Sequence, residues 1–384
     1  MQASSMSTPT AVDCGTIYVA IELSQKSWLI TLHGPDRDRF SRHKLEGGDC
    51  AGLLALIEKC HARTVEKLGS SPRVVSCYEA GYDGFWLHRR LVAVGIENLV
   101  FDPASIAVEQ RTRRAKTDRI DGELLLRTLM AHLRGEPRVV RIVRVPSVEE
   151  EDARRASRER DRLIQEQTAH TNRIKALLRL LGVAVGHPRR RDWLGWLARQ
   201  RDWQDLPVPP HLRAEVTREH ARLMLVREQL AALEQTQAAQ EAHVPATMTE
   251  RRNQLQRLKA LGPAFTATLV DELFYKDFRN RREVASYCGL TPSPWRSGGI
   301  EREQGISKAG NRRARQKAIE LAWLWLRHQP DSTLSQWFRT RTANAGKRAR
   351  RVAIVALARK LIVALWRYLA TGLVPEEAVM KTKA

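Results

Sequence analysis

The first hundred residues alternate between apolar stretches with strand character and one stretch with helical spacing. Residues 15–23 and 27–34 are rich in β-branched and aromatic residues and flank a short polar turn, which predicts a β-hairpin. Residues 39–47 fit a third strand. Residues 49–66 then repeat apolar positions with helical periodicity.

Further apolar segments complete this part of the chain. Residues 73–80 and 96–102 read as short buried strands, and residues 84–94 between them read as a helix. Another helix is predicted to begin near Thr117, a suitable N-cap residue. The order of three strands, helix, strand, helix, strand and helix indicates a mixed sheet with helices packed on it. This order resembles the ribonuclease H-like fold.

From about residue 148 the spacing becomes heptad-like. Two sets of residues repeat at intervals of three, four and seven: Leu163, His170, Ile174, Leu177 and Leu181, then Leu212, Val216, Leu223, Val226, Leu230 and Leu233. A segment rich in Trp, Arg and Pro, residues 187–210, separates them. An antiparallel helical hairpin and a coiled coil with another subunit both fit this pattern.

The last third of the chain is predicted to be mainly helical. Residues 258–273 contain a Leu-Gly-Pro turn that opens a helix, similar to a helix-hairpin-helix element, whose backbone amides grip phosphate. A final helix is expected at about 346–370.

The predicted fold class is therefore α/β plus α. A flexible tail at 1–14 precedes a mixed-sheet domain at 15–147, a coiled-coil or linker region at 148–249 and a C-terminal domain at 250–384.

Charge favours one class of partner. Lys and Arg number 65 against 43 Asp and Glu, for a net charge of +22, and they are spread along the whole chain. Such a distribution favours a polyanion, above all nucleic acid, over a membrane surface. The most apolar stretch, residues 352–370, is interrupted by Arg359 and Lys360, which favours a buried helix over a membrane span.

The cysteines and the N-terminus indicate the compartment. The five cysteines lack CxxC spacing, and the first residues lack the apolar core of a signal peptide. Free thiols and a cytoplasmic location are expected.

Two aspartates stand out within the basic sequence. Asp118 and Asp121 lie one helical turn apart and share a face. Alone, this pair fits a helix cap and solvated charge. Glu22 and Glu79, however, end two predicted strands that lie side by side in a ribonuclease H-like sheet. Four converging carboxylates would repel one another unless two Mg²⁺ ions, about 4 Å apart, lay between them.

Other acids compete for these roles. Asp13, Asp83 and Asp102 are rival ligands, although Asp102 precedes Pro103 and is better suited to shaping a turn.

A second group of candidate residues lies between residues 289 and 315. Ser297 follows Arg296 and precedes two glycines, which allow close approach of a ligand to the backbone. A serine hydroxyl needs a base, a metal or charge stabilisation to act as a nucleophile. A β-turn serine is the alternative interpretation, and Ser293 and Ser307 are other hydroxyls.

Basic residues near both groups are candidates for phosphate binding. They are Arg111, Arg113, Arg114 and Lys116 beside the aspartates, and Arg296, Arg302, Lys308, Arg312, Arg313 and Arg315 around the serine.

Several motifs together resemble a known family. "YEA", "KTDRIDGELL", "LGP", "GLTPSPWRSGG" and "GISKAGNRRAR" occur in this order, after an acid that ends the first strand. The pattern resembles the DEDD-type insertion-sequence transposases, related to the Piv-type DNA invertases and described as bridge-RNA-guided recombinases. The likeness covers about residues 15–370.

The resemblance implies a RuvC-like domain joined through a coiled coil to a transposase domain. The metal-binding tetrad then falls on Glu22, Glu79, Asp118 and Asp121, and the nucleophile on Ser297, which forms a phosphoserine link to DNA. The family usually has aspartate where this chain has Glu22, one methylene longer. The resemblance also implies Mg²⁺, donor and target DNA, a noncoding bridge RNA, and a dimer or tetramer.

Two other functions fit the residues. One is a RuvC-like, Mg²⁺-dependent junction nuclease that uses water, with Ser297 structural. The other is a non-catalytic nucleic-acid-binding protein. Base stacking by Trp193, Trp196 and Trp203 is less favoured than packing in a core or interface. Trp323 and Trp325 are expected in a helical core, and residues 347–360 fit either a phosphate-facing helix end or a solvated cap.

Overall fold

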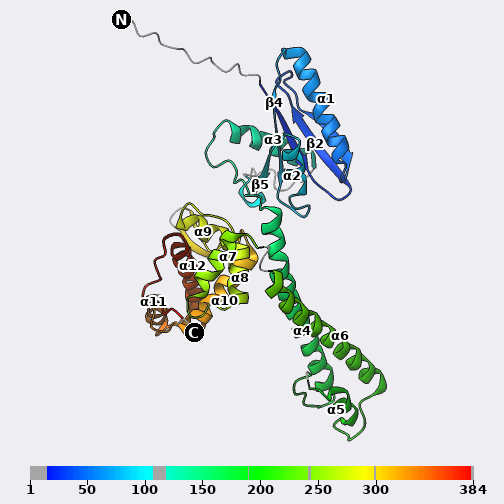
Figure 1. Cartoon of the computed structure of the whole chain (residues 1–384), viewed down its shortest axis with the longest axis vertical. Coiled ribbons are helices and arrows are strands. Elements are labelled where there is room, and N and C mark those ends of the chain that lie inside the picture. The colour runs from blue at the N-terminus through cyan, green and yellow to red at the C-terminus, as the bar shows by residue number, and fades with distance from the viewer. Residues whose placement is uncertain (1–14, 107–117, 189, 241–243, 298–299, 382–384) are drawn as a thin grey trace. The chain divides into compact units, whose positions relative to one another are not determined.

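The structure is a computed structural model that describes residues 15–381 except 107–117, 189, 241–243 and 298–299. Contacts divide the chain into two compact units, Met1–Val145 and Pro146–Ala384 (Figure 1). The predicted tail, Asp13, the predicted N-cap Thr117 and the basic run at 111–116 lie outside the described residues.

The first unit is built on a five-stranded mixed sheet with strand order β3-β2-β1-β4-β5. The strands are β1 (Thr16–Glu22), β2 (Ser27–His33), β3 (Ser41–Glu46), β4 (Arg73–Glu79) and β5 (Glu97–Phe101). β1, β2 and β3 pair antiparallel, whereas β4 runs parallel to both β1 and β5. Strand order and direction agree with the mixed sheet predicted from the sequence.

Helices cover both faces of this sheet. On one face, α1 (Cys50–Leu68) and α2 (Trp86–Ala93) bury their apolar residues against Ile17, Val19 and Ile21 of β1. On the other face, α3 (Asp118–Leu133) packs over Ala20, Val75 and Cys77. Successive β1 residues are buried on both sides because each face has its own helical cover.

The second unit begins with a long helical hairpin. α4 (Val148–Arg179) starts with a capping box formed by Ser147 and Glu150, and it packs along α6 (Pro210–Gln240). Two cross-helix ion pairs, Arg160–Glu234 and Arg173–Glu215, and a hydrogen bond between His170 and Glu219 show that the helices are antiparallel. The structure thus shows the intrachain hairpin, one of the two arrangements that the heptads allowed. A coiled coil with another subunit stays a prediction.

The tip of this hairpin has its own small core. The short helix α5 (Trp193–Arg199) places Trp193 against Trp196 and His220, with ring centroids 4.5 and 5.6 Å apart. Trp193 is 1% exposed, so it packs in a core, whereas Trp203 is 77% exposed.

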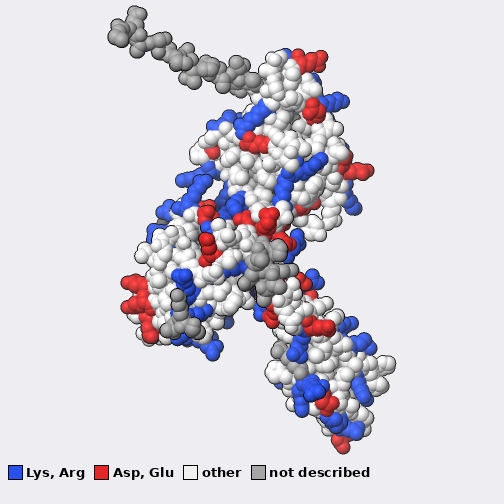
Figure 2. All heavy atoms as spheres, viewed as in Figure 1, with Lys and Arg blue, Asp and Glu red and all other residues white. Residues whose placement is uncertain are grey.

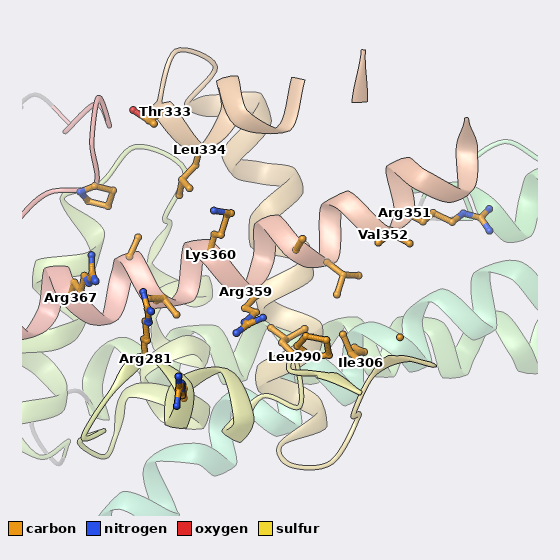
Figure 3. A pocket seen from close by; sticks show the side chains of 18 of the residues that line it. Arg281, Leu290, Ile306, Thr333, Leu334, Arg351, Val352, Arg359, Lys360 and Arg367 are labelled. Carbon is orange, nitrogen blue, oxygen red and sulfur yellow. The ribbon is translucent and has the colours of Figure 1, made fainter. Parts of the chain in front are cut away.

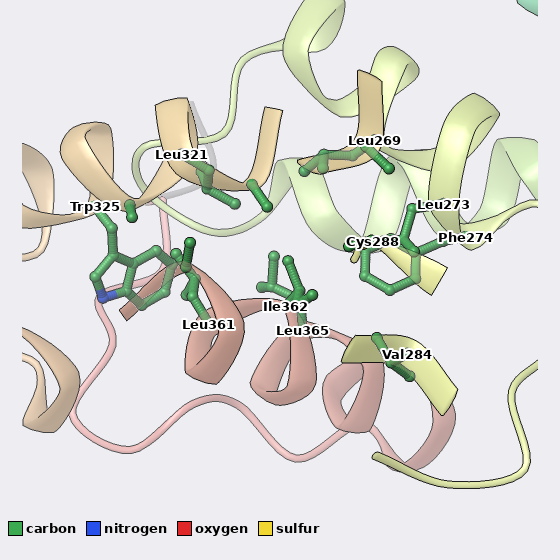
Figure 4. Close-up of a cluster of buried hydrophobic side chains, with 14 of the residues drawn as sticks. Leu269, Leu273, Phe274, Val284, Cys288, Leu321, Trp325, Leu361, Ile362 and Leu365 are labelled. Carbon is green, nitrogen blue, oxygen red and sulfur yellow. The ribbon is translucent and has the colours of Figure 1, made fainter. Parts of the chain in front are cut away.

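The remaining helices surround one large apolar core. They are α7 (Ala246–Gln256), α8 (Pro263–Leu269), a π-helical turn (Val270–Phe274), α9 (Arg281–Tyr287), α10 (Arg312–His328), α11 (Thr333–Thr342) and α12 (Lys347–Thr371). Residues from α8, α9, α10 and α12 interdigitate in this core, as Figure 4 shows for Leu269, Val284, Leu321 and Leu361. Trp325 is fully buried there as expected, but Trp323 is half exposed, contrary to the expectation.

One β-hairpin interrupts these helices. It consists of β6 (Pro292–Ser297) and β7 (Ile300–Ile306) and was not predicted from the sequence. The Leu-Gly-Pro turn does open a helix, because α8 begins at Pro263, but its phosphate-binding role stays a prediction.

Two expectations concern the chain as a whole. The four cysteines that the structure describes are free thiols. Among the described residues, no helix is both long and apolar enough to cross a membrane.

Candidate active site

Two glutamates end the two central parallel strands of the sheet. β1 ends at Glu22 and β4 ends at Glu79. Ile21 and Tyr78, the residues immediately before them, pair in register. Neighbouring strands lie about 4.8 Å apart in a sheet. The backbone therefore places Glu22 and Glu79 side by side at the same end of the sheet.

Both glutamates belong to the sheet face that α3 covers. Side chains alternate between the two faces of a strand, so Glu22 shares a face with Ala20, and Glu79 shares a face with Cys77. Ala20 and Cys77 are buried in the cluster beneath α3. Burial raises the pKa of the Cys77 thiol, and the charge of nearby Glu79 raises that pKa further. One carboxylate oxygen of Glu22 is buried.

The first turn of α3 lies at this end of the sheet. A Cβ at Gly122 would stand 2.7 Å from Thr31 Oγ1 and 3.6 Å from Leu29 Cδ2, so a glycine allows the helix to approach β2 this closely. Leu29 pairs in register with Glu22 across the β1–β2 ladder. Further along α3, a backbone carbonyl oxygen lies 3.8 Å from Cys77 Sγ. The helix start therefore lies level with the end of β1.

Asp118 and Asp121 occupy the sheet-facing stripe of α3. Helix positions three and four apart share a face. Asp121 is four residues before Leu125, which is buried against the sheet, and Asp118 is four residues before Gly122. The Asp121 side chain is partly buried, whereas the side chain of Asp118 is not among those described. The positions of all four predicted acids thus lie toward one end of one sheet face.

Ser297 ends the first strand of the hairpin in the second unit. Its Cα partner is Ile300, so Ser297 directly precedes the two glycines that connect β6 to β7. The side chains of residues 295–303 are outside the described set, which includes Arg296 and Arg302. Ser293 lies near the other end of β6, beside a register shift, and the Ser307 hydroxyl accepts a hydrogen bond from Thr291.

The segments on either side of this hairpin have a structural role. A Cβ at Gly310 would stand 2.3 Å from the Tyr287 carbonyl oxygen, and Gly310 has φ of +102°. The Lys308 amide donates to the Gly289 carbonyl at 3.1 Å, and Asn311 caps α10 with its side chain. The segments on either side of the hairpin are therefore joined by backbone contacts that exclude a side chain, which fixes the base of the hairpin.

Comparisons with known proteins decide the family. A model described as "Transposase" matches residues 35–182, and one described as "Transposase IS116/IS110/IS902 family" matches residues 252–337. A Sinorhizobium fredii protein named "Putative transposase y4rJ" is 47% identical over 385 residues, covering 97% of each chain. The chain belongs to the IS110/IS116 family of DEDD transposases.

More distant relatives have similar names. The "Transposase for insertion sequence element IS1111A" of Coxiella burnetii is 24% identical over 73% of this chain and 74% of that protein. The "Transposase for insertion sequence element IS1328" of Yersinia enterocolitica is 26% identical over 58% of this chain and 64% of that protein. The family predicted from the motifs is confirmed, and the transposase is an enzyme that acts on DNA.

The carboxylates of the transposase suit magnesium by their donor chemistry, because Mg²⁺ prefers hard oxygen ligands. Within the part of the chain whose side chains are described, no group of three or more His, Cys, Asp or Glu residues is arranged to hold a metal ion. Those side chains include Glu22, Glu79 and Asp121 but not Asp118. Binding of Mg²⁺ by all four carboxylates therefore stays a prediction.

Rival acids of the transposase have other partners or positions. Asp102 caps a short 3₁₀ turn, Pro103–Ser105, and pairs with Arg141, so it shapes a turn as expected. Glu123, the next acid of α3, forms an ion pair with Arg42 of β3. Asp83 lies in the turn after β4.

Two arginines predicted to bind phosphate are held by the protein itself. Arg313 lies 2.7 Å from Asp161 and 3.0 Å from Glu272. Arg315 donates to the carbonyl oxygens of Cys288 and Lys308. Lys308 and Arg312, in contrast, are exposed. Nucleic-acid binding by these residues stays a prediction, and it is best supported for the exposed pair.

Sequence reasoning missed most of a basic groove along α12. Arg281 and Arg282 of α9 line it together with Arg359, Lys360 and Arg367 of α12. The signal was present in the sequence, because the α12 residues recur at intervals that keep them on one helical stripe. Basic side chains also cover other parts of the surface (Figure 2).

Proposed function

We propose that this transposase cuts DNA with Ser297 as its nucleophile, while Glu22, Glu79, Asp118 and Asp121 bind Mg²⁺. The bound metal would supply charge stabilisation to the phosphate under attack. The DEDD class of transposase domain is typically dependent on divalent metals, which supports this assignment of the carboxylates.

The chemistry is a phosphoryl transfer that keeps a phosphate ester throughout. Ser297 Oγ attacks the scissile phosphorus, its proton passes to solvent or to a neighbouring base, and an Oγ–P bond forms. The bond from phosphorus to one deoxyribose oxygen breaks, and that oxygen leaves as a hydroxyl after taking up a proton. A sugar hydroxyl from another DNA end then attacks the phosphoserine, rejoins the backbone and releases Ser297.

The observation that carries the proposal is the placement of the acids. Glu22 and Glu79 end adjacent parallel strands on the face covered by α3, and Gly122 brings the first turn of that helix to the same end. The proposal is supported because three independent segments of the sequence have acids at backbone positions toward one end of the sheet, which solvated surface charge alone would not require.

The test is recombination of a plasmid reporter by the full chain with its cognate flanking DNA and Mg²⁺. Ser297→Ala should abolish both recombination and the covalent protein–DNA adduct. Asp121→Asn should lower both at least about a hundredfold, because it removes charge from the metal site. Ser293→Ala, a hydroxyl on the same strand, and Asp83→Asn, an acid in the turn after β4, should remain close to wild type.

Other outcomes would support the competing functions. Unimpaired strand cleavage by Ser297→Ala would favour a junction nuclease that uses water. Wild-type activity of both Asp118→Ala and Asp121→Ala would reject the metal site. Inactivity of the unmutated chain with its RNA, DNA and Mg²⁺ would favour a non-catalytic binding protein.

We also propose a noncoding bridge RNA and a dimer or tetramer as the working assembly. The net charge of +22 supports an RNA partner in addition to DNA, because phosphate contacts provide affinity without reading sequence. Base pairing of the RNA would then select donor and target DNA. The protein should be purified from cells carrying the native flanking DNA, and recovery of no discrete flanking transcript would contradict this partner.

A further inference from the structure

A large groove runs along α12 in the second unit. It has a volume of about 1260 Å³. α9 and the base of the β6–β7 hairpin line one side, and the start of α11 and the segment after α12 line the other. Figure 3 shows Arg281, Leu290 and Ile306 on one side of α12, and Thr333 and Leu334 on the other.

Positive charge follows the whole length of the groove. α12 contributes Arg348, Arg351, Arg359, Lys360 and Arg367. From Arg348 to Arg367 the helix rises roughly 28 Å. Arg281, Arg282 and Lys308 face the groove from the opposite elements, and Glu376 is the acidic residue among the lining residues.

The cations of the groove have few partners within the described part of the chain, where Lys360 lies 4.8 Å from the centroid of the Trp337 ring. None of the basic side chains lining the groove forms an ion pair with a carboxylate that the structure describes. Elsewhere in the same unit, Arg158, Arg252 and Arg313 are all paired with buried acids. Because like charges spaced along a helix destabilise it, an uncompensated row indicates an external anion.

The floor of the groove is apolar. Val352, Val355 and Val363 of α12 lie between the cations, and Leu290, Ile306 and Leu334 add apolar surface from other elements. Val352 is 60% exposed, although the opposite stripe of α12 is buried in the core. A ligand that fits this groove must combine negative charge along its length with apolar surface.

We propose that this groove binds a single-stranded segment of nucleic acid, with phosphates on the basic rims and bases or sugars on the apolar floor. A single strand exposes base faces and sugars that a duplex keeps inside its stack. A duplex would offer its phosphates to the rims and leave the valine floor uncovered. The chemistry fits single-stranded RNA and single-stranded DNA equally.

The groove also meets the element that carries Ser297. Pro292 and Ile306 line the groove and pair in register at the base of the hairpin, and Ser297 ends the same strand. Five residues of strand correspond to roughly 17 Å. A single strand of nucleic acid held in the groove would therefore lead toward Ser297, the proposed nucleophile. This link to cutting rests on the proposed function, whereas binding in the groove does not.

The test compares two double variants that remove the same charge from the same helix. Arg351→Ala with Arg359→Ala changes the groove, and Lys347→Ala with Arg350→Ala changes exposed residues outside it. Fluorescence anisotropy measures the Kd of the full chain for labelled single-stranded DNA, single-stranded RNA and duplex DNA. All proteins carry Ser297→Ala, so the result does not depend on cutting.

The groove variant should raise the Kd for a single strand about fivefold or more and flatten its log–log salt slope by roughly 1.4, as expected for two lost phosphate contacts. The Kd of the groove variant for duplex DNA should change less than about twofold. The Kd of the control variant should also change less than about twofold for each ligand. The strand type with the larger loss identifies RNA or DNA as the ligand. Val352→Ser should weaken single-strand binding without changing the salt slope.

Three results would overturn the proposal. Equal losses from the groove and control variants would mean that only net charge matters. Equal losses for duplex and single strand would remove the preference that the floor implies. If the groove variant lost affinity for duplex DNA or for a labelled acidic peptide but kept its affinity for single strands, the groove would be assigned to another partner.

Discussion

Glu272 shows how a single buried side chain connects distant parts of the second unit. It is 1% exposed, receives two hydrogen bonds from Arg158 of α4 at 2.8 and 3.2 Å, and lies 3.0 Å from Arg313. Asn311, the cap of α10, also donates to it at 3.0 Å. Burial alone would raise the pKa of Glu272, but the hydrogen bonds and the arginine charges lower it below the ordinary value.

Glu272→Gln should therefore destabilise the fold by roughly 2 kcal/mol, since the partner arginines are partly exposed. Because the folded-state pKa is lowered, this stabilisation is present above the ordinary glutamate value of 4.5 and is lost as the pH falls through the lower folded value. Urea denaturation at a series of pH values measures both effects. Glu234→Gln, in a more exposed pair with Arg160, should cost less than about 1 kcal/mol. A pH-independent difference between wild type and Glu272→Gln would contradict this account.

At the scale of elements, the periodicity of apolar residues predicted those strands and helices that depend on local sequence. The strands and helices of the first unit follow from alternation and helical spacing, and the observed bounds differ from the predicted ones by a few residues. β6 was missed because Pro292 and Pro294 argue against a strand. The ion pairs of Arg313 could not be predicted either, because its partners Asp161 and Glu272 are distant in sequence. The four acids were predicted from chain order and family likeness, not from spacing alone, and their role as metal ligands stays a prediction.

The close approach of α3 to β2 gives a prediction at this scale. Gly122→Ala should lower recombination about tenfold to a hundredfold by displacing the turn that carries Asp118 and Asp121, while the helix itself is retained. Thr31 Oγ1 is buried and has no hydrogen-bond partner among the described residues, so Thr31→Ala alone should have little effect. Combined with Gly122→Ala, it should restore activity by making room for the new methyl group. Reporter recombination and circular dichroism measure activity and fold, and failure of the double variant to recover would reject the steric explanation.

At the scale of the whole molecule, the two proposed sets of catalytic groups lie in separate compact units. The acids belong to Met1–Val145 and Ser297 belongs to Pro146–Ala384, each unit with a buried core of its own. Basic side chains are spread over both units, consistent with a nucleic acid that contacts both (Figure 2). Since these groups are far apart in sequence and in different units, the working assembly can supply them from one chain or from two.

Mixing two inactive variants distinguishes these arrangements. Ser297→Ala keeps the acids, and Asp121→Asn keeps the serine. We expect the active site to be shared between chains, so a mixture should form covalent DNA adducts on the Asp121→Asn chain alone, at about a quarter of the wild-type amount for a twofold dimer at equal concentrations. A size tag on that chain identifies it on a denaturing gel, and each variant alone is the control. If the mixed protomers are shown to associate and still form no adduct, the acids and the serine act within one chain.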